Sequence, residues 1–210
     1  MNLSPIIHVS FDDEMLCLGW ADGLQLRQPL TRHRQLQEAT PEQRAGFLID
    51  RRGRSVSWPE LGEAAADVDA IDWIWDSLCN ESMSRLQALD WQLESLPADD
   101  QAIVALWRLE ADGYNGGFLQ FFCNWGEQTC GLALDTLQAI GARGARALVS
   151  RQRRLIEHLV DHPQLEQRWD IPGLLSDEQH ELISGELDEQ LWKAMEEIPA
   201  LAVKYFYLGE

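Results

Sequence analysis

The spacing of the apolar residues changes part-way along this chain, and this change constrains the fold more than any other feature. Before about residue 60, short apolar runs such as Ile6–Phe11 and Met15–Trp20 are separated by turn-forming residues, which is typical of strands. From Ala64 onward the apolar residues recur with a period of about 3.6, the period of an amphipathic helix. We therefore expect an α+β chain, with a small antiparallel-sheet domain at residues 1–66 followed by an all-α domain at residues 67–210.

The N-terminal runs are joined by residues that favour tight turns. Three acidic residues at 12–14 follow the first run, and the Asp22-Gly23 step, a favoured hairpin pair, precedes a third run at Leu24–Leu26. These signals predict a three-stranded meander.

A second pair of strands is expected after a helical stretch. Residues 31–44 have helical composition and are interrupted at Thr40-Pro41, where Thr can cap a helix and Pro suits its first turn. The runs 46–50 and 55–58 then predict two paired strands, and Trp58-Pro59 is expected to end the sheet.

The helical part contains recognisable start and stop signals. Asp99 or Asp100 is expected to cap one helix, and Gly141 is expected to end another that begins near Glu127. Ser176 with Gln179 three residues later has the spacing of a capping box.

The charge of the chain restricts its partners. The formal net charge is −18, from 35 acidic and 17 basic residues, and a surface this acidic repels nucleic acid and anionic membranes. The acidic residues are concentrated in two segments: residues 71–140 hold 11 acidic and 2 basic residues (−9), and residues 171–210 hold 9 and 2 (−7). Residues 141–170 between them hold 4 acidic and 6 basic residues (+2). We expect a basic protein as the partner and no direct contact with nucleic acid or membrane.

Eight acidic residues in the most acidic third of the chain are the candidates for a partner-binding surface. An ordinary solvated face is the alternative interpretation of the same residues. The eight are Asp72, Asp76, Asp90, Glu94, Asp99, Asp100, Glu110 and Asp112.

The basic residues between the two acidic segments form a stripe without regular aromatic residues. Because the surrounding charge disfavours nucleic-acid binding, we expect these arginines to pair with acids of neighbouring helices. They are Arg143, Arg146, Arg151, Arg153 and Arg154.

The most unusual local string lies at residues 112–126, where two adjacent glycines precede a run of aromatic residues. It is interpreted either as a tight loop that leads into a buried aromatic helix, or as a ligand-binding turn in which two polar side chains four residues apart share a face. It is not a phosphate-binding loop, because the spaced glycines and the Lys-Ser/Thr ending are absent. The candidate residues of this string are Asn115, Gly116, Gly117, Phe118, Gln120, Phe121 and Asn124.

No arrangement of residues predicts catalysis. Among the dispersed histidines, His158 and His162 share helical spacing, but Leu159 stands where a metalloprotease has its Glu, and no GxSxG motif occurs. The four cysteines, Cys17, Cys79, Cys123 and Cys130, form no CxxC pair, so free buried thiols are expected. We expect no enzyme activity, no metal and no cofactor.

The chain is expected in the cytoplasm. No run approaches the roughly 18 apolar residues of a membrane span, and acidic residues at 12–14 interrupt the region where a signal peptide has its apolar run.

Two segments resemble known families. Residues 6–69, through the Asp22-Gly23 turn and Trp58-Pro59, resemble a small bacterial domain of unknown function with a DG turn and a W-P motif. Residues from about 97 to 160, through Gly113–Asn124 and Ala139–Ala142, resemble the helical domain family of an acidic bacterial DNA-mimic protein.

The second resemblance implies an all-helical domain that uses surface carboxylates to occupy the DNA-binding face of a regulator. It implies that the glycine-aromatic string is a packing signature, and it transfers no individual carboxylate. The chain is thus expected to be a non-enzymatic binder of a basic, DNA-binding protein. Two alternatives remain open: an immunity or antitoxin-like protein that neutralises a toxin, and a small-ligand module or enzyme centred on residues 115–124.

Overall fold

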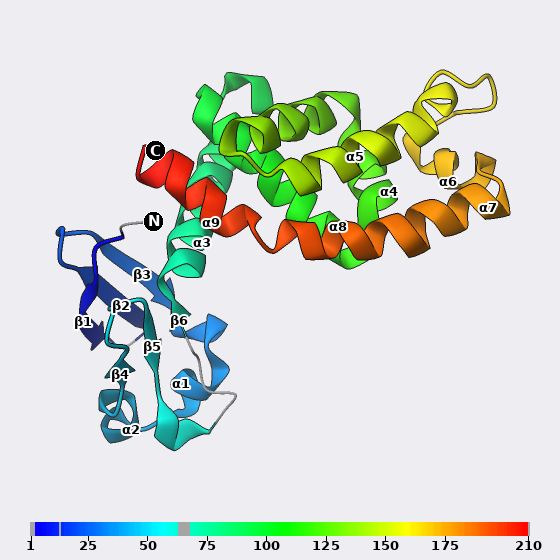
Figure 1. Ribbon diagram of the computed structural model, residues 1–210. Helices are drawn as coiled ribbons and strands as arrows, with labels where there is room; N and C mark the ends of the chain where they lie inside the picture. The colour runs from blue at the N-terminus through cyan, green and yellow to red at the C-terminus, as the bar shows by residue number, and fades with distance from the viewer. Residues whose placement is uncertain (1–2, 13, 63–67, 210) are drawn as a thin grey trace. The chain divides into compact units, whose positions relative to one another are not determined.

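The computed structural model describes residues 3–12, 14–62 and 68–209 (Figure 1). The chain divides into two compact units, Met1–Ser77 and Leu78–Glu210, each considered by itself. The first contains the strands and the second is helical, which confirms the predicted α+β class. The predicted boundary between residues 66 and 67 lies outside the described residues.

The first sheet is the predicted meander. Strands β1 (Ile6–Phe11), β2 (Met15–Trp20) and β3 (Gln25–Pro29) pair antiparallel in that order. Leu18 lies opposite Val9 on one side and Leu26 on the other. Leu16 and Leu18 are fully buried, so the apolar alternation of β2 faces the core of this unit.

The second sheet has a strand that the sequence pattern missed. Strands β4 (Leu48–Ile49) and β5 (Ser55–Ser57) pair antiparallel as predicted, but β6 (Val68–Asp69) adds to the other side of β5. The expectation that Trp58-Pro59 ends the sheet is therefore wrong. Proline ends the strand in which it occurs, and the short 3₁₀ turn η2 (Pro59–Leu61) follows, but neither prevents a later segment from pairing with β5.

Short helices connect the two sheets. The 3₁₀ turn η1 (Leu30–Arg32) and helix α1 (Arg34–Glu38) precede α2 (Pro41–Ala45), which begins at a complete capping box between Thr40 and Gln43. Helix α3 (Ala70–Ala88) starts in the first unit and continues into the second.

In the C-terminal unit the end of α3 is followed by the 3₁₀ turn η3 (Leu93–Ser95), and the unit is organised around α4 (Ala98–Ile140), a run of 43 residues. Non-helical backbone angles at Gly116, Gly117 and Gly126 divide α4 into three consecutive helical segments. The expectation that Asp99 or Asp100 caps this helix is wrong. Pro97 occupies the N-cap position and makes no side-chain hydrogen bond there. The predicted stop at Gly141 is confirmed, with the left-handed backbone that favours glycine.

The rest of the unit packs against α4. Helix α5 (Arg143–Ile156) lies beside it, followed by η4 (Glu157–Leu159), η5 (Arg168–Asp170) and α6 (Ile171–Leu174). A continuous helical run follows: α7 (Asp177–His180), the π-helical η6 (Glu181–Leu187) and α8 (Asp188–Met195). Helix α9 (Ile198–Ala202) and the π-helical η7 (Val203–Tyr207) end the fold.

Helices α4, α5 and α8 lie side by side and bury the core of the C-terminal unit between them (Figure 1). The aromatic rings of Phe118, Phe121 and Phe122 from α4 are almost fully buried, as are Val149 of α5 and Leu191 of α8. Within the described ranges, no helix has both the length and the apolar character that a bilayer span requires.

Candidate functional site

Gly117, in the string at residues 112–126, allows a buried carboxylate to cap a new helical segment. Gly117 has φ +76°, and a Cβ atom built on it would lie 1.8 Å from Oδ2 of Asp188. The backbone N–H of Phe118, the first residue of the new segment, donates to Asp188 Oδ1 at 3.0 Å. Side chains other than hydrogen do not fit at position 117, because the Asp188 carboxylate fills that space.

Asp188 is buried among polar groups rather than beside a cation. Gln152 of α5 donates to it from Nε2 at 2.6 Å, so one carboxylate joins α4, α5 and α8. Burial raises the pKa of Asp188, while the hydrogen bonds from Phe118 and Gln152 oppose that rise. Because Asp188 is only 2% exposed, it belongs to the framework and not to the acidic surface.

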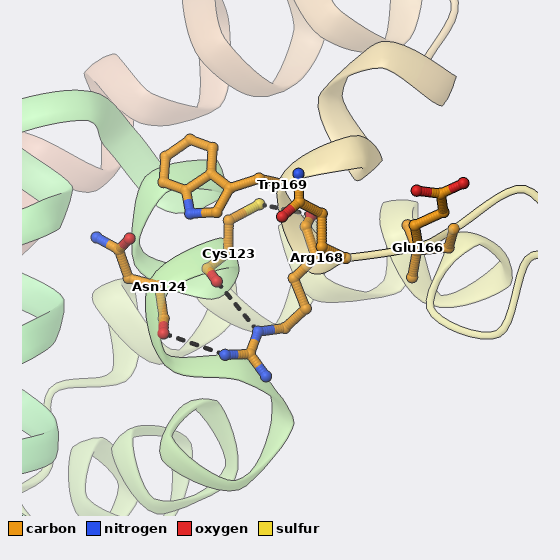
Figure 2. Close-up of a pocket in the computed structure, with 7 residues that line it drawn as sticks. Cys123, Asn124, Glu166, Arg168 and Trp169 are labelled. Carbon is orange, nitrogen blue, oxygen red and sulfur yellow. Dashed lines mark hydrogen bonds between the residues drawn. The ribbon is translucent and has the colours of Figure 1, made fainter.

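The other end of the aromatic segment is capped by an arginine. Gly126 (φ +72°) ends the segment Phe118–Trp125. Arg168 donates from its guanidinium to the backbone carbonyls of Cys123 (3.1 Å) and Asn124 (3.2 Å), as Figure 2 shows. An anion at the N-terminus and a cation at the C-terminus both complement the helix dipole, which explains why so short a segment is stable.

The polar residues of the string converge on Asp112. Its carboxylate accepts hydrogen bonds from Gln120 (2.8 Å), Asn124 (3.0 Å) and the indole of Trp125 (2.5 Å). The guanidinium of Arg108 stacks on the Trp125 ring at 3.8 Å. The predicted shared face of Gln120 and Asn124 therefore exists, but their amide N–H groups are used within the protein, which supports the packing interpretation of this string.

A surface hollow of about 570 Å³ lies next to this segment (Figure 2). Its lining includes Cys123, Arg168 and Trp169. Burial raises the pKa of the Cys123 thiol to about 11 and that of Cys130 to about 12, so both are protonated at neutral pH and are poor nucleophiles. In the ranges that the structure describes, no three metal-ligating side chains lie together.

The eight predicted acidic residues have different fates in the structure. Asp72 and Asp76 lie in the N-terminal unit, where Asp76 pairs with Arg32 at 3.2 Å. Burial raises the pKa of Asp72, and the nearby carboxylates of Asp69 and Asp76 raise it further. In the C-terminal unit Glu110 is half-buried, and three of the eight are exposed: Asp90, Glu94 and Asp99.

Two of the eight have partners within the protein. The Asp100 side chain is 7% exposed, pairs with Arg85 at 2.6 Å and accepts a hydrogen bond from Ser82 at 2.7 Å. Asp112 is held by the three donors described above. Assigning Asp100 to a surface was wrong, because composition does not reveal which acids find buried internal partners, whereas Asp112 is half-buried.

The second acidic segment, residues 171–210, contains a helix with many exposed carboxylates. We define the acidic helix as α7, η6 and α8 together with Glu196 and Glu197. Its buried side carries Ile183, Leu187, Leu191 and Met195, spaced four residues apart. Seven carboxylates are exposed along it: Asp177, Glu178, Glu181, Glu186, Glu189, Glu196 and Glu197.

None of these seven carboxylates has an ion-pair partner among the described residues. The sequence signal for this surface was the charge of residues 171–210, but no individual acid was singled out there. Lys193 is the only lysine or arginine in residues 177–197, all of which the structure describes, and His180 lies in α7. The acidic helix is therefore a long, open and strongly negative face.

The arginine stripe lies on α5, next to α8. Arg153 pairs with Glu127 at 2.5 Å and with Glu157 at 4.0 Å, which confirms the predicted pairing for that residue. The other four lie exposed, and the described residues provide them with no ion pair: Arg143, Arg146, Arg151 and Arg154. The C-terminal unit thus carries a positive stripe beside a negative helix.

Comparison with known families confirms both resemblances. A family model described as DMP19-like protein matches residues 94–207, which is more than half of the chain. A second model, described as a protein of unknown function (DUF2442), matches residues 6–67. No match was found among curated proteins or among solved structures.

Proposed function

Since this chain belongs to the DMP19-like protein family, we propose that it is a non-enzymatic acidic binding protein that occupies the basic face of a DNA-binding protein. The acidic helix of the C-terminal unit is the surface that makes this contact. The partner is a transcription regulator or another protein whose natural ligand is duplex DNA.

The observation that carries the proposal is the charge density of the acidic helix. At the α-helical rise of 1.5 Å per residue, residues 177–197 extend over at most about 30 Å, since the π-helical η6 rises less per residue; one turn of duplex DNA is roughly 34 Å. Seven exposed carboxylates over this length give about one charge per 4 Å, against about one per 3.4 Å for a single DNA strand. A basic groove that accommodates a phosphate backbone therefore meets a similar density of charge.

The fixed shape of the helix also supports mimicry. Its buried residues, the Asp188 network and its packing against α4 and α5 hold the helix backbone in place before binding. Little free energy is therefore lost in ordering this helix when a partner binds. Its charge also speeds the encounter with a basic protein.

The test is a competition experiment. The full chain is immobilised, exposed to a native lysate at low salt, and then washed with a 30-base-pair duplex or with the same mass of an uncharged polymer. We expect the duplex to release captured proteins, and those proteins to bind DNA by themselves. Captured proteins that stay bound in the presence of duplex, and that do not bind DNA, would overturn the proposal.

This experiment also separates the proposal from its alternative. A toxin neutralised by an immunity-like mechanism is captured whether or not duplex is present, unless its own site binds nucleic acid. Identifying the released proteins by mass spectrometry then decides between a DNA-binding regulator and a toxin.

A further inference from the structure

Two exposed aromatic rings lie at the junction of α4 and α8. Tyr114 is 49% exposed and Trp192 is 36% exposed. The Tyr114 hydroxyl donates to the backbone carbonyl of Trp192 at 3.3 Å, and the Trp192 indole donates to the carbonyl of Gly113 at 2.6 Å. Each ring is therefore held by a hydrogen bond to the opposite helix, so little conformational entropy is lost when a partner contacts it.

Carboxylates surround this aromatic pair. Burial raises the pKa of Tyr114, and the charges of Glu110 and Glu196 raise it further. Glu110 lies four residues before Tyr114 on α4, so the two are neighbours on the surface of that helix. Glu189 and Glu196 lie three residues before and four residues after Trp192, so they are its neighbours on the surface of the helix.

This combination has a specific chemical complement. A guanidinium group is planar, stacks on aromatic rings and pairs with carboxylates through several N–H donors. An ammonium group is more strongly hydrated and stacks less well, so the site discriminates between arginine and lysine. Trp, Tyr and Arg are also the residues that contribute most to binding at protein interfaces.

We propose that Tyr114 and Trp192 form a subsite for an arginine side chain of the partner protein, with Glu189 and Glu196 pairing its charge. The inference rests on the proposed function, because that function supplies the basic partner. It adds a short-range, arginine-specific contact to the long-range attraction of the acidic helix. This contact depends less on salt than the exposed carboxylates do.

The experiment uses two probes of equal charge, a hexa-arginine and a hexa-lysine peptide, titrated calorimetrically into the full chain. The variants are Trp192→Leu and Tyr114→Leu. The matched control is Trp91→Leu, which removes an exposed tryptophan (56%) beside Asp90 and Glu94. Thermal melts establish that each variant is folded, and if Trp192→Leu is not, Tyr114→Leu carries the test.

We expect the wild-type chain to bind hexa-arginine more tightly than hexa-lysine. The Trp192→Leu and Tyr114→Leu variants should lose this preference through roughly threefold to thirtyfold weaker binding of hexa-arginine, with hexa-lysine little changed. The Trp91→Leu variant should keep it.

Equal binding of the two peptides by the wild type, or an arginine preference that survives both substitutions, would overturn the subsite. If neither peptide binds the wild-type chain, the proposed subsite is overturned too. The proposed function fails separately, in the duplex competition experiment, which uses neither peptide.

Discussion

Gly117 and Asp188 depend on each other. The positive φ of Gly117 is expensive for any residue with a side chain, and the space beside it is filled by the Asp188 carboxylate. The Asp188 carboxylate in turn accepts a hydrogen bond from the N–H of Phe118, which is free to donate because it follows the non-helical turn at Gly117. Packing therefore accounts for Gly117 within the most distinctive string of the sequence.

Replacing Gly117 by Ala should destabilise the C-terminal unit by about 3 kcal/mol, from backbone strain and from displacement of the carboxylate. Gly131→Ala is the matched control, because Gly131 lies within α4 without a positive φ and with nothing close to its added methyl group. That variant should be stabilised by about 0.5–1 kcal/mol. Urea unfolding of both variants measures the difference, and equal stabilities would contradict this role of Gly117.

The titration of Asp188 should make the free energy of unfolding depend on pH. Its pKa in the folded chain is raised by burial, so the folded state binds this proton more tightly than the unfolded state does. The protonated Asp188 therefore contributes its full stabilisation of the fold below the pKa that this group has in the unfolded chain. The stabilisation is lost as the pH rises through its pKa in the folded chain.

Asp188→Asn should accordingly gain free energy of unfolding relative to the wild type as pH rises from about 4 to about 7. Urea unfolding at several pH values measures this difference. Asp177→Asn, which removes an exposed carboxylate of the same acidic helix, is the matched control for the loss of one negative charge. A difference for Asp188→Asn that does not change with pH would show that its proton is not linked to folding.

At the scale of the element, the segment Phe118–Trp125 is held at both ends by residues distant in sequence. Asp188 caps its start and Arg168 caps its end. Neither cap adjoins the segment in the chain, so its stability depends on the rest of the unit.

Arg168→Ala should destabilise the unit by about 1 kcal/mol and should increase hydrogen exchange most in residues 123–130. Arg154→Ala removes an exposed arginine of α5 and should leave that exchange unchanged. Exchange measured by mass spectrometry compares the two variants. Increased exchange spread evenly over the unit would count against a local cap.

Elements with local signals were predictable from the sequence. The capping boxes at Thr40 and Ser176 and the stop at Gly141 need only residues that are close together in the chain, and all are present. Strand β6 was not predictable, because two residues carry no periodicity and its pairing with β5 is not local.

The same distinction applies to the candidate surface. Sequence located the acidic segments, but Asp100 was misassigned because its partners Arg85 and Ser82 lie 15 and 18 residues away in the chain. The exposed acids of residues 177–197 required the buried side of their helix to be known. Charge can be counted in a sequence, whereas exposure follows from packing.

At the scale of the molecule, charge is abundant but unequally available. The chain has 35 acidic residues, and several of them pair internally or cap other groups. We therefore expect the position of a carboxylate to matter more for partner binding than the net charge of the chain.

The measurement that tests this most directly compares two triple variants of equal charge. One removes Glu181, Glu186 and Glu189 from the acidic helix, and the other removes Glu14, Glu42 and Glu60, which are exposed in the N-terminal unit; all are replaced by Gln. Affinity for a DNA-binding protein released in the duplex competition is measured between about 50 and 200 mM salt.

We expect the wild type and the N-terminal triple variant to share a steep loss of affinity with salt. The acidic-helix variant should bind roughly tenfold or more weakly at low salt and should show a shallower salt dependence, since up to three ion contacts are removed. Equal affinities and equal salt slopes for the two triple variants would contradict the claim that the acidic helix is the binding surface.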